Sequence, residues 1–203
     1  MMQVFDCEQG TAEWFECRAG IVTASCAKDL LAKGQGKTRM AYMYKLMGEV
    51  MTGEPVQVWA GNGHTERGHE HEPIAISLYE KRHKVTVEPC GFIRNHDDIG
   101  GAGYSPDGRV GSSGGVEAKS RLPHIQVELL DTRKVPRDAL LQTQFGMWVS
   151  GWEWIDYISY CPGLPLFVER IEADEKQHEE FREELIKFYG EMNQKLASLA
   201  QAA

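Results

Sequence analysis

The sequence lacks any long apolar run. Although 42% of its 203 residues are hydrophobic, no apolar stretch approaches the roughly 20 residues that a membrane-spanning helix needs. The segment Met1–Cys7 has neither the basic nor the apolar stretch of a secretory signal peptide. These absences argue against a membrane protein and predict a cytoplasmic one. The apolar content is sufficient for a single globular domain over residues 1–203.

Cysteine is scarce, and its pattern points to no cross-link. The five cysteines are odd in number and scattered, and no two of them form a Cys-x-x-Cys pair: Cys7, Cys17, Cys26, Cys90 and Cys161. This spacing argues against a disulfide framework and against a structural zinc site. It favours reduced thiols in a cytosolic compartment.

Positive charge is also in short supply. The chain has 22 Lys and Arg against 30 Asp and Glu, for a net charge of −8. Proteins that bind nucleic acid usually cluster Lys and Arg, so this balance counts against such a partner. Part of the acidic excess is local, between Glu169 and Glu184. A narrow basic track elsewhere on the surface therefore stays compatible with the composition.

A phosphate-binding P-loop is absent too. The segment Gly34–Thr38 ends in Gly-Lys-Thr, but the glycine that a P-loop requires five residues earlier is replaced by Leu31. The segment is also predicted to connect two helices, with no strand before it. We therefore expect no ATP site here and instead predict a flexible basic loop with Lys33, Lys37 and Arg39.

The most informative motif is a turn followed by a short charged strand. Ser105–Gly108 reads Ser-Pro-Asp-Gly, and ten residues after Asp107 the chain continues Glu117-Ala118-Lys119. Side chains alternate along a strand, so Glu117 and Lys119 share one face. Two carboxylates can hold Mg²⁺ through oxygen, and the lysine can orient or deprotonate a water. The pattern predicts metal-assisted phosphodiester hydrolysis, the alternative being a plain turn before an exposed strand.

Four sequence blocks, in a fixed order, carry a resemblance to a known family. They are Arg18–Ser25, Arg67-Gly68 with Glu72-Pro73, Ser105–Lys119, and Gln142–Trp148. Together they resemble the PD-(D/E)xK nucleases and, among these, the phage-type alkaline exonucleases or YqaJ-like viral recombinases, which include the phage lambda exonuclease. The resemblance implies an α/β fold with a restriction-endonuclease-like core, in which helices flank a central mixed β-sheet.

The resemblance also implies roles for particular residues. Asp107, Glu117 and the carbonyl of Ala118 would hold the metal, and Lys119 would position the attacking water. Glu72 and Gln142 would join this catalytic group from two helices. Arg18 and Ser25 would hold the 5′ phosphate of the DNA, and Ser25 is predicted in the first turn of a helix, where free N–H groups favour an anion.

The function implied is a Mg²⁺-dependent exonuclease, with Mn²⁺ as a substitute, that degrades the 5′ strand of linear double-stranded DNA. The 3′ single strand that remains would serve recombination by strand annealing. A homotrimeric ring, a phage single-strand annealing protein as partner and the host cytoplasm as location follow from the same resemblance. Two alternatives stay open: a structure-specific or restriction-type endonuclease on the same core, and a non-catalytic DNA-end-binding protein.

Hydrophobic periodicity and capping residues predict the elements. Helices are expected over Thr11–Cys17, Thr23–Gly34, Thr38–Thr52, Gly63–Lys81 (kinked at Pro73), Pro136–Trp148 and Asp174–Ala200. Strands are expected over 85–94, 99–110 and 115–120 as a meander, and over Ile155–Tyr160 and Leu166–Ile171.

Overall fold

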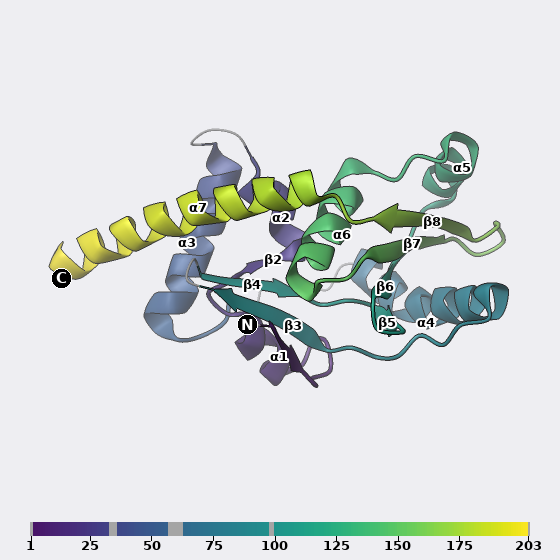
Figure 1. The fold of residues 1–203 in the computed structure, drawn as a ribbon, viewed down its shortest axis with the longest axis horizontal. Helices are drawn as coiled ribbons and strands as arrows, with labels where there is room; N and C mark the ends of the chain where they lie inside the picture. The colour runs from purple at the N-terminus through teal and green to yellow at the C-terminus, as the bar shows by residue number, and fades with distance from the viewer. Residues whose placement is uncertain (1, 33–35, 57–62, 98–99, 203) are drawn as a thin grey trace.

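The computed structural model describes residues 2–32, 36–56, 63–97 and 100–202, which form two four-stranded mixed sheets with helices packed around them (Figure 1). The first sheet has the order β1-β3-β4-β2, with β1 Met2–Phe5, β3 Phe92–Asp97, β4 Gly100–Tyr104 and β2 Val22–Thr23. The second has the order β5-β6-β7-β8, with β5 Gly108–Val110, β6 Gly114–Ser120, β7 Trp154–Tyr160 and β8 Phe167–Glu172.

The helices fill the connections between these strands. They are α1 Ala12–Arg18, α2 Ala27–Leu30, α3 Lys37–Thr52, α4 Gly63–His83, α5 Pro123–Thr132, α6 Arg137–Ser150 and α7 Glu175–Ala202, with a 3₁₀ turn over Ala24–Cys26. Strands β6 and β7 are parallel, so the chain must cross over between them, and α5 and α6 form that crossover. Helix α4 packs on β6 and β7. Within the described ranges, no helix combines the length and the apolarity that crossing a bilayer requires.

The expected α/β fold class, with helices flanking a mixed β-sheet, is confirmed, although the strands are divided between two mixed sheets where one central sheet was expected. The expected meander is wrong, because the chain changes sheet within it. Strand β4 ends at Tyr104 in the first sheet, and β5 begins at Gly108 in the second. Pro106 lies between them and has no N–H to continue a strand ladder. The break brings Asp107 to the junction of the two sheets.

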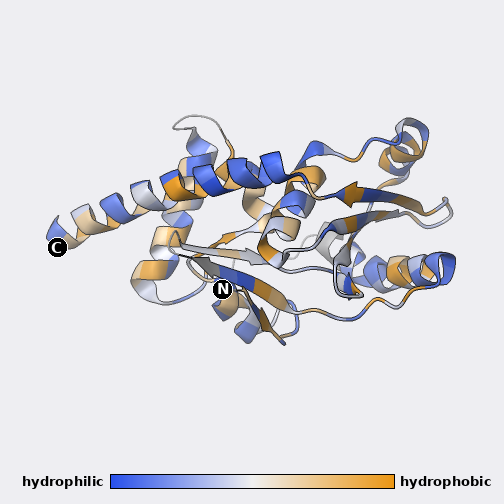
Figure 2. Cartoon of the chain, viewed as in Figure 1, coloured by the Kyte–Doolittle hydropathy of each residue, from blue (hydrophilic) through white to orange (hydrophobic). Residues whose placement is uncertain are grey.

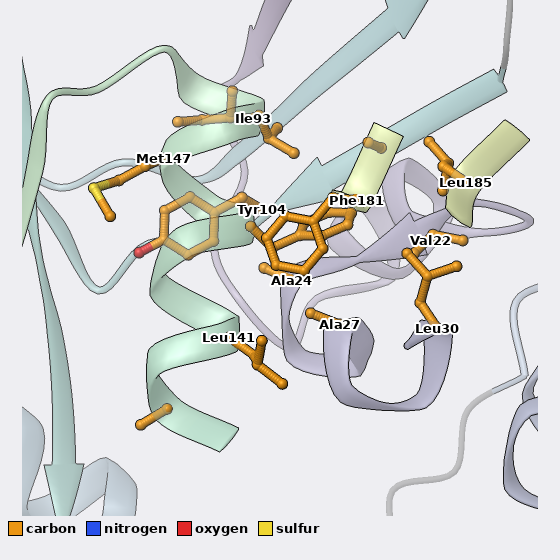
Figure 3. Close-up of a cluster of buried hydrophobic side chains, with 14 of the residues drawn as sticks. Val22, Ala24, Ala27, Leu30, Ile93, Tyr104, Leu141, Met147, Phe181 and Leu185 are labelled. Atoms are coloured by element: carbon orange, nitrogen blue, oxygen red, sulfur yellow. The ribbon is translucent and has the colours of Figure 1, made fainter. Parts of the chain in front are cut away.

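The main hydrophobic core lies between the sheets and helices α2, α3, α6 and α7 (Figure 3). Helix α3 contributes Met43, Leu46 and Met47, as its periodicity predicts, and α7 contributes Phe181 and Leu185. Figure 2 shows that hydrophilic and hydrophobic residues alternate along the long helices α4 and α7. The C-terminal end of α7 extends past α3 (Figure 1).

Two helix predictions need correction. The predicted helix from Thr23 is replaced by β2, the 3₁₀ turn and the short α2, because the β-branched pair Val22-Thr23 aligns in parallel with β4. Helix α4 runs through Pro73 where an interruption was predicted. Pro73 is exposed and lacks only its own N–H, so the other hydrogen bonds of α4 can continue past it. Helix α5, with Pro123 in its first turn, was not predicted.

The predicted basic loop is wrong for Arg39. Lys33, Gly34 and Gln35 lie outside the described residues, and Arg39 belongs to α3. Its side chain is 8% exposed, and its guanidinium donates to both carboxylate oxygens of Glu191 on α7, at 2.7 and 2.9 Å. Arg39 therefore ties α3 to α7 and has little surface left for another partner.

The contact between Gly146 and Tyr104 generates a stability prediction. A Cβ at Gly146 on α6 would lie 2.8 Å from the Tyr104 ring, so Gly146→Ala should destabilise the fold by about 1–3 kcal/mol through overpacking. Gly190→Ala is the matched control, because its Cβ would meet nothing within 4 Å in the middle of α7. The control should gain up to about 1 kcal/mol from helix propensity. Urea denaturation followed by circular dichroism measures both, and equal effects would contradict the packing argument.

Candidate active site

Four of the five predicted catalytic residues gather in one hollow at the junction of the two sheets, the exception being Glu72. The hollow has a volume of about 210 Å³. Asp107 reaches it from the segment between β4 and β5, Glu117 and Lys119 from β6, and Gln142 from α6. The full lining is Gln9, Trp14, Arg18, Ala24, Ser25, Tyr104, Ser105, Asp107, Glu117, Lys119 and Gln142.

The Glu117 carboxylate is the most constrained group in the hollow. Its side chain is 1% exposed. Lys119 Nζ and Gln142 Nε2 both donate to its Oε1, at 2.5 and 2.6 Å, and the Tyr104 hydroxyl donates to its Oε2 at 3.1 Å. Figure 3 shows the Tyr104 ring in the core, with its oxygen directed away from the cluster. A buried carboxylate needs such partners, and here they come from β4, β6 and α6.

Asp107 is forced close to Glu117. Its Oδ2 accepts a hydrogen bond from the Ala118 N–H at 2.6 Å. Burial and the neighbouring Glu117 charge raise the pKa of Asp107 well above its ordinary value, although Lys119 acts in the opposite direction. Two carboxylates held together in this way repel each other when both are ionised, and either a proton or a bound cation relieves the repulsion.

The donor set fits a hard divalent cation. Carboxylate oxygens from Asp107 and Glu117 are the ligands that Mg²⁺ prefers. A residue in a strand directs its N–H and its C=O to the same side, so the Ala118 carbonyl faces the Asp107 side as its N–H does. In the part of the chain that the structure describes, no three His, Cys, Asp or Glu side chains form a metal-holding group. The cation would therefore rest on two carboxylates and this carbonyl.

Lys119 stays protonated in this setting. Burial by itself lowers the pKa of the Lys119 ammonium, but the charges of Glu117 and Asp107 more than offset this, and the pKa is raised. An ammonium has no lone pair to accept a proton. Of the two predicted roles, orienting a water therefore fits Lys119 better than deprotonating one.

Arg18 and Ser25 line the same hollow. Arg18 Nη1 donates to Ser105 Oγ at 3.0 Å, and its guanidinium stacks 4.0 Å from the centre of the Trp14 ring. Trp14 Nε1 also donates to Ser105 Oγ, at 2.9 Å. Ser25 is exposed and belongs to the 3₁₀ turn. The prediction that it lies in the first turn of an α-helix is therefore wrong. The Ser25 hydroxyl, 3.3 Å from Thr23 Oγ1, is the polar group that this residue offers.

Glu72 approaches the hollow from α4. Burial raises the pKa of Glu72, the Lys119 charge lowers it and the Glu117 charge raises it further. The Glu72 carboxylate therefore interacts electrostatically with Glu117 and Lys119. Ser120, next to Lys119, fixes this helix. Its Oγ accepts from Arg67 Nε at 3.1 Å and lies 2.8 Å from His71 Nδ1.

Several residues that support this arrangement were not among the predicted site residues, including Trp14, Tyr104, Ser105 and Ser120. Tyr104, Ser105 and Ser120 lie directly beside the two charged motifs in the sequence, and this proximity could have identified them as site residues. No sequence signal identifies Trp14, because its hydrogen bond to Ser105 joins residues 91 positions apart.

A family model for the YqaJ-like viral recombinase domain matches residues 13–153. The chain belongs to this family. The four resemblance blocks fall within the matched range, as do all the site residues described above except Gln9. No curated protein sequence matches the chain significantly.

Solved structures agree with the YqaJ-like assignment. The structure is similar to LHK-Exo in complex with dAMP, at 33% identity and a TM-score of 0.86, over 95% of this chain and 97% of that one. A second LHK-Exo structure, an alkaline exonuclease from Laribacter hongkongensis, gives 32% identity and 0.85 over the same shares. A phage-related exonuclease from Haemophilus somnus 129PT shares the fold, at 13% identity and a TM-score of 0.64 over 88% and 96%.

The paired carboxylates of this YqaJ-like site generate a prediction about pH. Because folding raises the pKa of Asp107, the folded protein holds a proton that the unfolded chain loses near pH 4. Metal-free stability should therefore fall as the pH rises through the folded pKa, and Mg²⁺ should offset this loss. The melting-temperature gain from Mg²⁺ should be larger at pH 8 than at pH 5.

Asp107→Asn tests the cause of this effect. The variant should stabilise the metal-free protein at pH 8 by about 1–2 kcal/mol, because a like-charge contact is removed, and it should lose the Mg²⁺ response. Asp131→Asn, at an exposed position on α5, is the matched control and should keep that response. A wild-type protein with no Mg²⁺-dependent melting shift would refute the cation site.

Proposed function

We propose that this protein is a Mg²⁺-dependent exonuclease that degrades the 5′ strand of linear double-stranded DNA in the 5′ to 3′ direction. The supporting observation is that one hollow holds both the Asp107–Glu117–Lys119 group and the Arg18 side chain. A hydrolytic centre beside a site for a terminal phosphate suits removal of nucleotides from a strand end. Family membership and the likeness to alkaline exonucleases support the same reaction class.

The residues divide the chemical work. A bound Mg²⁺ supplies Lewis acidity and a water of lowered pKa. Asp107, Glu117 and the Ala118 carbonyl hold it, and Mn²⁺, which accepts the same oxygen donors, can substitute. The Lys119 ammonium orients the water and stabilises charge that develops on the phosphate. Gln142 and Tyr104 keep the Glu117 carboxylate in one orientation, and Glu72 adds a further carboxylate from α4.

The end of the strand is held at Arg18. A terminal 5′ phosphate carries more negative charge than an internucleotide phosphate, and a guanidinium can bind it through two parallel hydrogen bonds. Stacking on Trp14 and the bond to Ser105 pre-orient Arg18 for this contact, and Ser25 adds a hydroxyl. The complex of the related LHK-Exo with dAMP, a nucleoside 5′-monophosphate, supports a nucleotide-sized site of this kind.

Assembly and partners complete the proposal. A chain with net charge −8 attracts DNA weakly over most of its surface. A closed homotrimeric ring around the DNA would prevent dissociation without strong attraction. The 3′ single strand it leaves would pass to a phage single-strand annealing protein in the cytoplasm of the host.

Two other functional hypotheses compete with this proposal. An endonuclease on the same core would not need a site for a strand end, and Arg18 beside the metal site favours the exonuclease. A non-catalytic DNA-end-binding protein would not need Asp107, Glu117 and Lys119 together in one hollow.

Cleavage assays separate these possibilities. The protein should degrade a linear duplex in Mg²⁺ and release label from its 5′ ends before its 3′ ends, while closed circular DNA stays intact. Lys119→Ala should lower the rate at least about 100-fold, because water orientation and charge stabilisation are lost. Lys81→Ala, in the exposed last turn of α4, should leave it unchanged. Cutting of the circular DNA, or label released first from 3′ ends, would contradict the proposal.

Arg18→Ala tests the strand-end site. The rate on duplexes with 5′-phosphate ends should fall about tenfold or more, because a charge-assisted contact is lost, whereas duplexes with 5′-hydroxyl ends should lose little. Arg182→Ala, on an exposed part of α7, is the matched control. Equal losses on both substrates would assign Arg18 a structural role through Trp14 and Ser105.

A further inference from the structure

A second hollow adjoins the candidate active site. It has a volume of about 240 Å³ and shares three lining residues with the first hollow: Ser25, Lys119 and Gln142. Arg18 lines the first hollow and not the second, whereas Lys28 and Arg121 line the second and not the first. The two hollows therefore meet at Lys119 and extend from it in different directions.

Arg121 is held firmly in the wall of this second hollow. It directly follows β6, and its backbone N–H continues the pairing with β7 by donating to the Tyr160 carbonyl at 3.0 Å. Its Nε and Nη2 both donate to the Tyr157 hydroxyl, at 3.3 and 3.1 Å, and Tyr157 is fully buried. These two bonds occupy the Nε and Nη2 edge of the guanidinium, and Nη1 lies on its opposite side. An anchored guanidinium loses less conformational entropy when it binds a ligand.

Lys28 supplies a second cation from a different element. It lies on α2, three residues after Ser25, and its side chain is exposed. Asp29 and Asp138 also line the hollow, so its three cations, Lys28, Lys119 and Arg121, exceed its two carboxylates by one charge. This balance attracts a singly charged phosphodiester only weakly. Weak attraction suits a strand that must advance after each cleavage.

We propose that the second hollow binds the DNA backbone on the 3′ side of the bond that is cut. This inference rests on the proposed function. If the 5′ phosphate lies at Arg18 and the scissile phosphate at Lys119, the strand continues away from Arg18, and the hollow with Lys28 and Arg121 lies on that route. These two side chains contact an internucleotide phosphate there and set the register of the strand in the active site.

The test combines side-chain and phosphate neutralisation. Duplexes with a 5′ phosphate are made with one uncharged methylphosphonate at the first, second or third linkage beyond the scissile bond. At one of these positions the substitution should raise the wild-type KM about tenfold, the effect of losing one charge-assisted phosphate contact. Arg121→Gln should raise the KM by a similar factor on the ordinary duplex and respond no further to the methylphosphonate at that position.

This non-additivity distinguishes direct contact from a structural role. A variant that merely loosens Tyr157 would show, at each methylphosphonate position, the same further increase in KM as the wild type shows there. Such additivity, or a wild-type KM in Arg121→Gln, would overturn the proposal. If Arg121→Gln fails to fold, the same KM measurement on Lys28→Gln, at an exposed position of α2, provides an independent test. Arg182→Gln on α7 is the control and should match the wild type.

A binding measurement separates this proposal from the proposed function. Fluorescence anisotropy with a labelled 5′-phosphorylated single strand in EDTA needs no cleavage. Arg121→Gln and Lys28→Gln should each weaken binding about three- to tenfold at low salt, with a smaller salt dependence. Absence of cleavage by the wild type, with this loss of binding present, would refute the exonuclease and keep the strand site. Unchanged binding in both variants would refute the strand site whatever the cleavage result.

Discussion

The arrangement of this molecule depends on one buried carboxylate. Glu117 is almost completely shielded from water, and such a group is stable only when hydrogen-bond donors surround it. Its donors are Lys119 on its own strand, Gln142 on α6 and Tyr104 at the end of β4. Meeting this requirement brings together the first sheet, the second sheet and the crossover helix. The site and the join between the sheets are therefore the same structure.

The second constraint is the pairing of charges of the same sign. Asp107 is placed near Glu117 by the change of sheet at Pro106, and its pKa is raised by burial and by the Glu117 charge. In a purely structural site this repulsion would be a cost without a benefit. Beside a carbonyl and an ammonium, it is the arrangement expected where a divalent cation is to be bound. Perturbed ionisable groups that line a hollow are typical of functional sites.

Several of the chain's positive charges are grouped in one place. Arg18, Lys119, Arg121 and Lys28 line two adjoining hollows, while most of the acidic residues between Glu169 and Glu184 are exposed on the outside of the molecule. Other cations are used within the fold, as Arg39 is in its ion pair with Glu191. Net charge therefore says little about where an anionic strand can bind. The local grouping of the cations is what matters.

Local sequence determined the elements whose signals are contained in a few neighbouring residues. The periodicity of α3 and α7, the alternation of Glu117 and Lys119, and the turn at Asp107 depend on residues close in the chain, and the structure has them as predicted. The resemblance blocks also contain most of the residues that line the hollow, but not Gln9, Trp14 or Tyr104. Tertiary structure alone decided the break of a predicted strand between two sheets and the partnership of Trp14 with Ser105 across 91 positions. It also placed Arg121 beside Tyr157. Such contacts depend on how distant segments pack, and no local pattern records them.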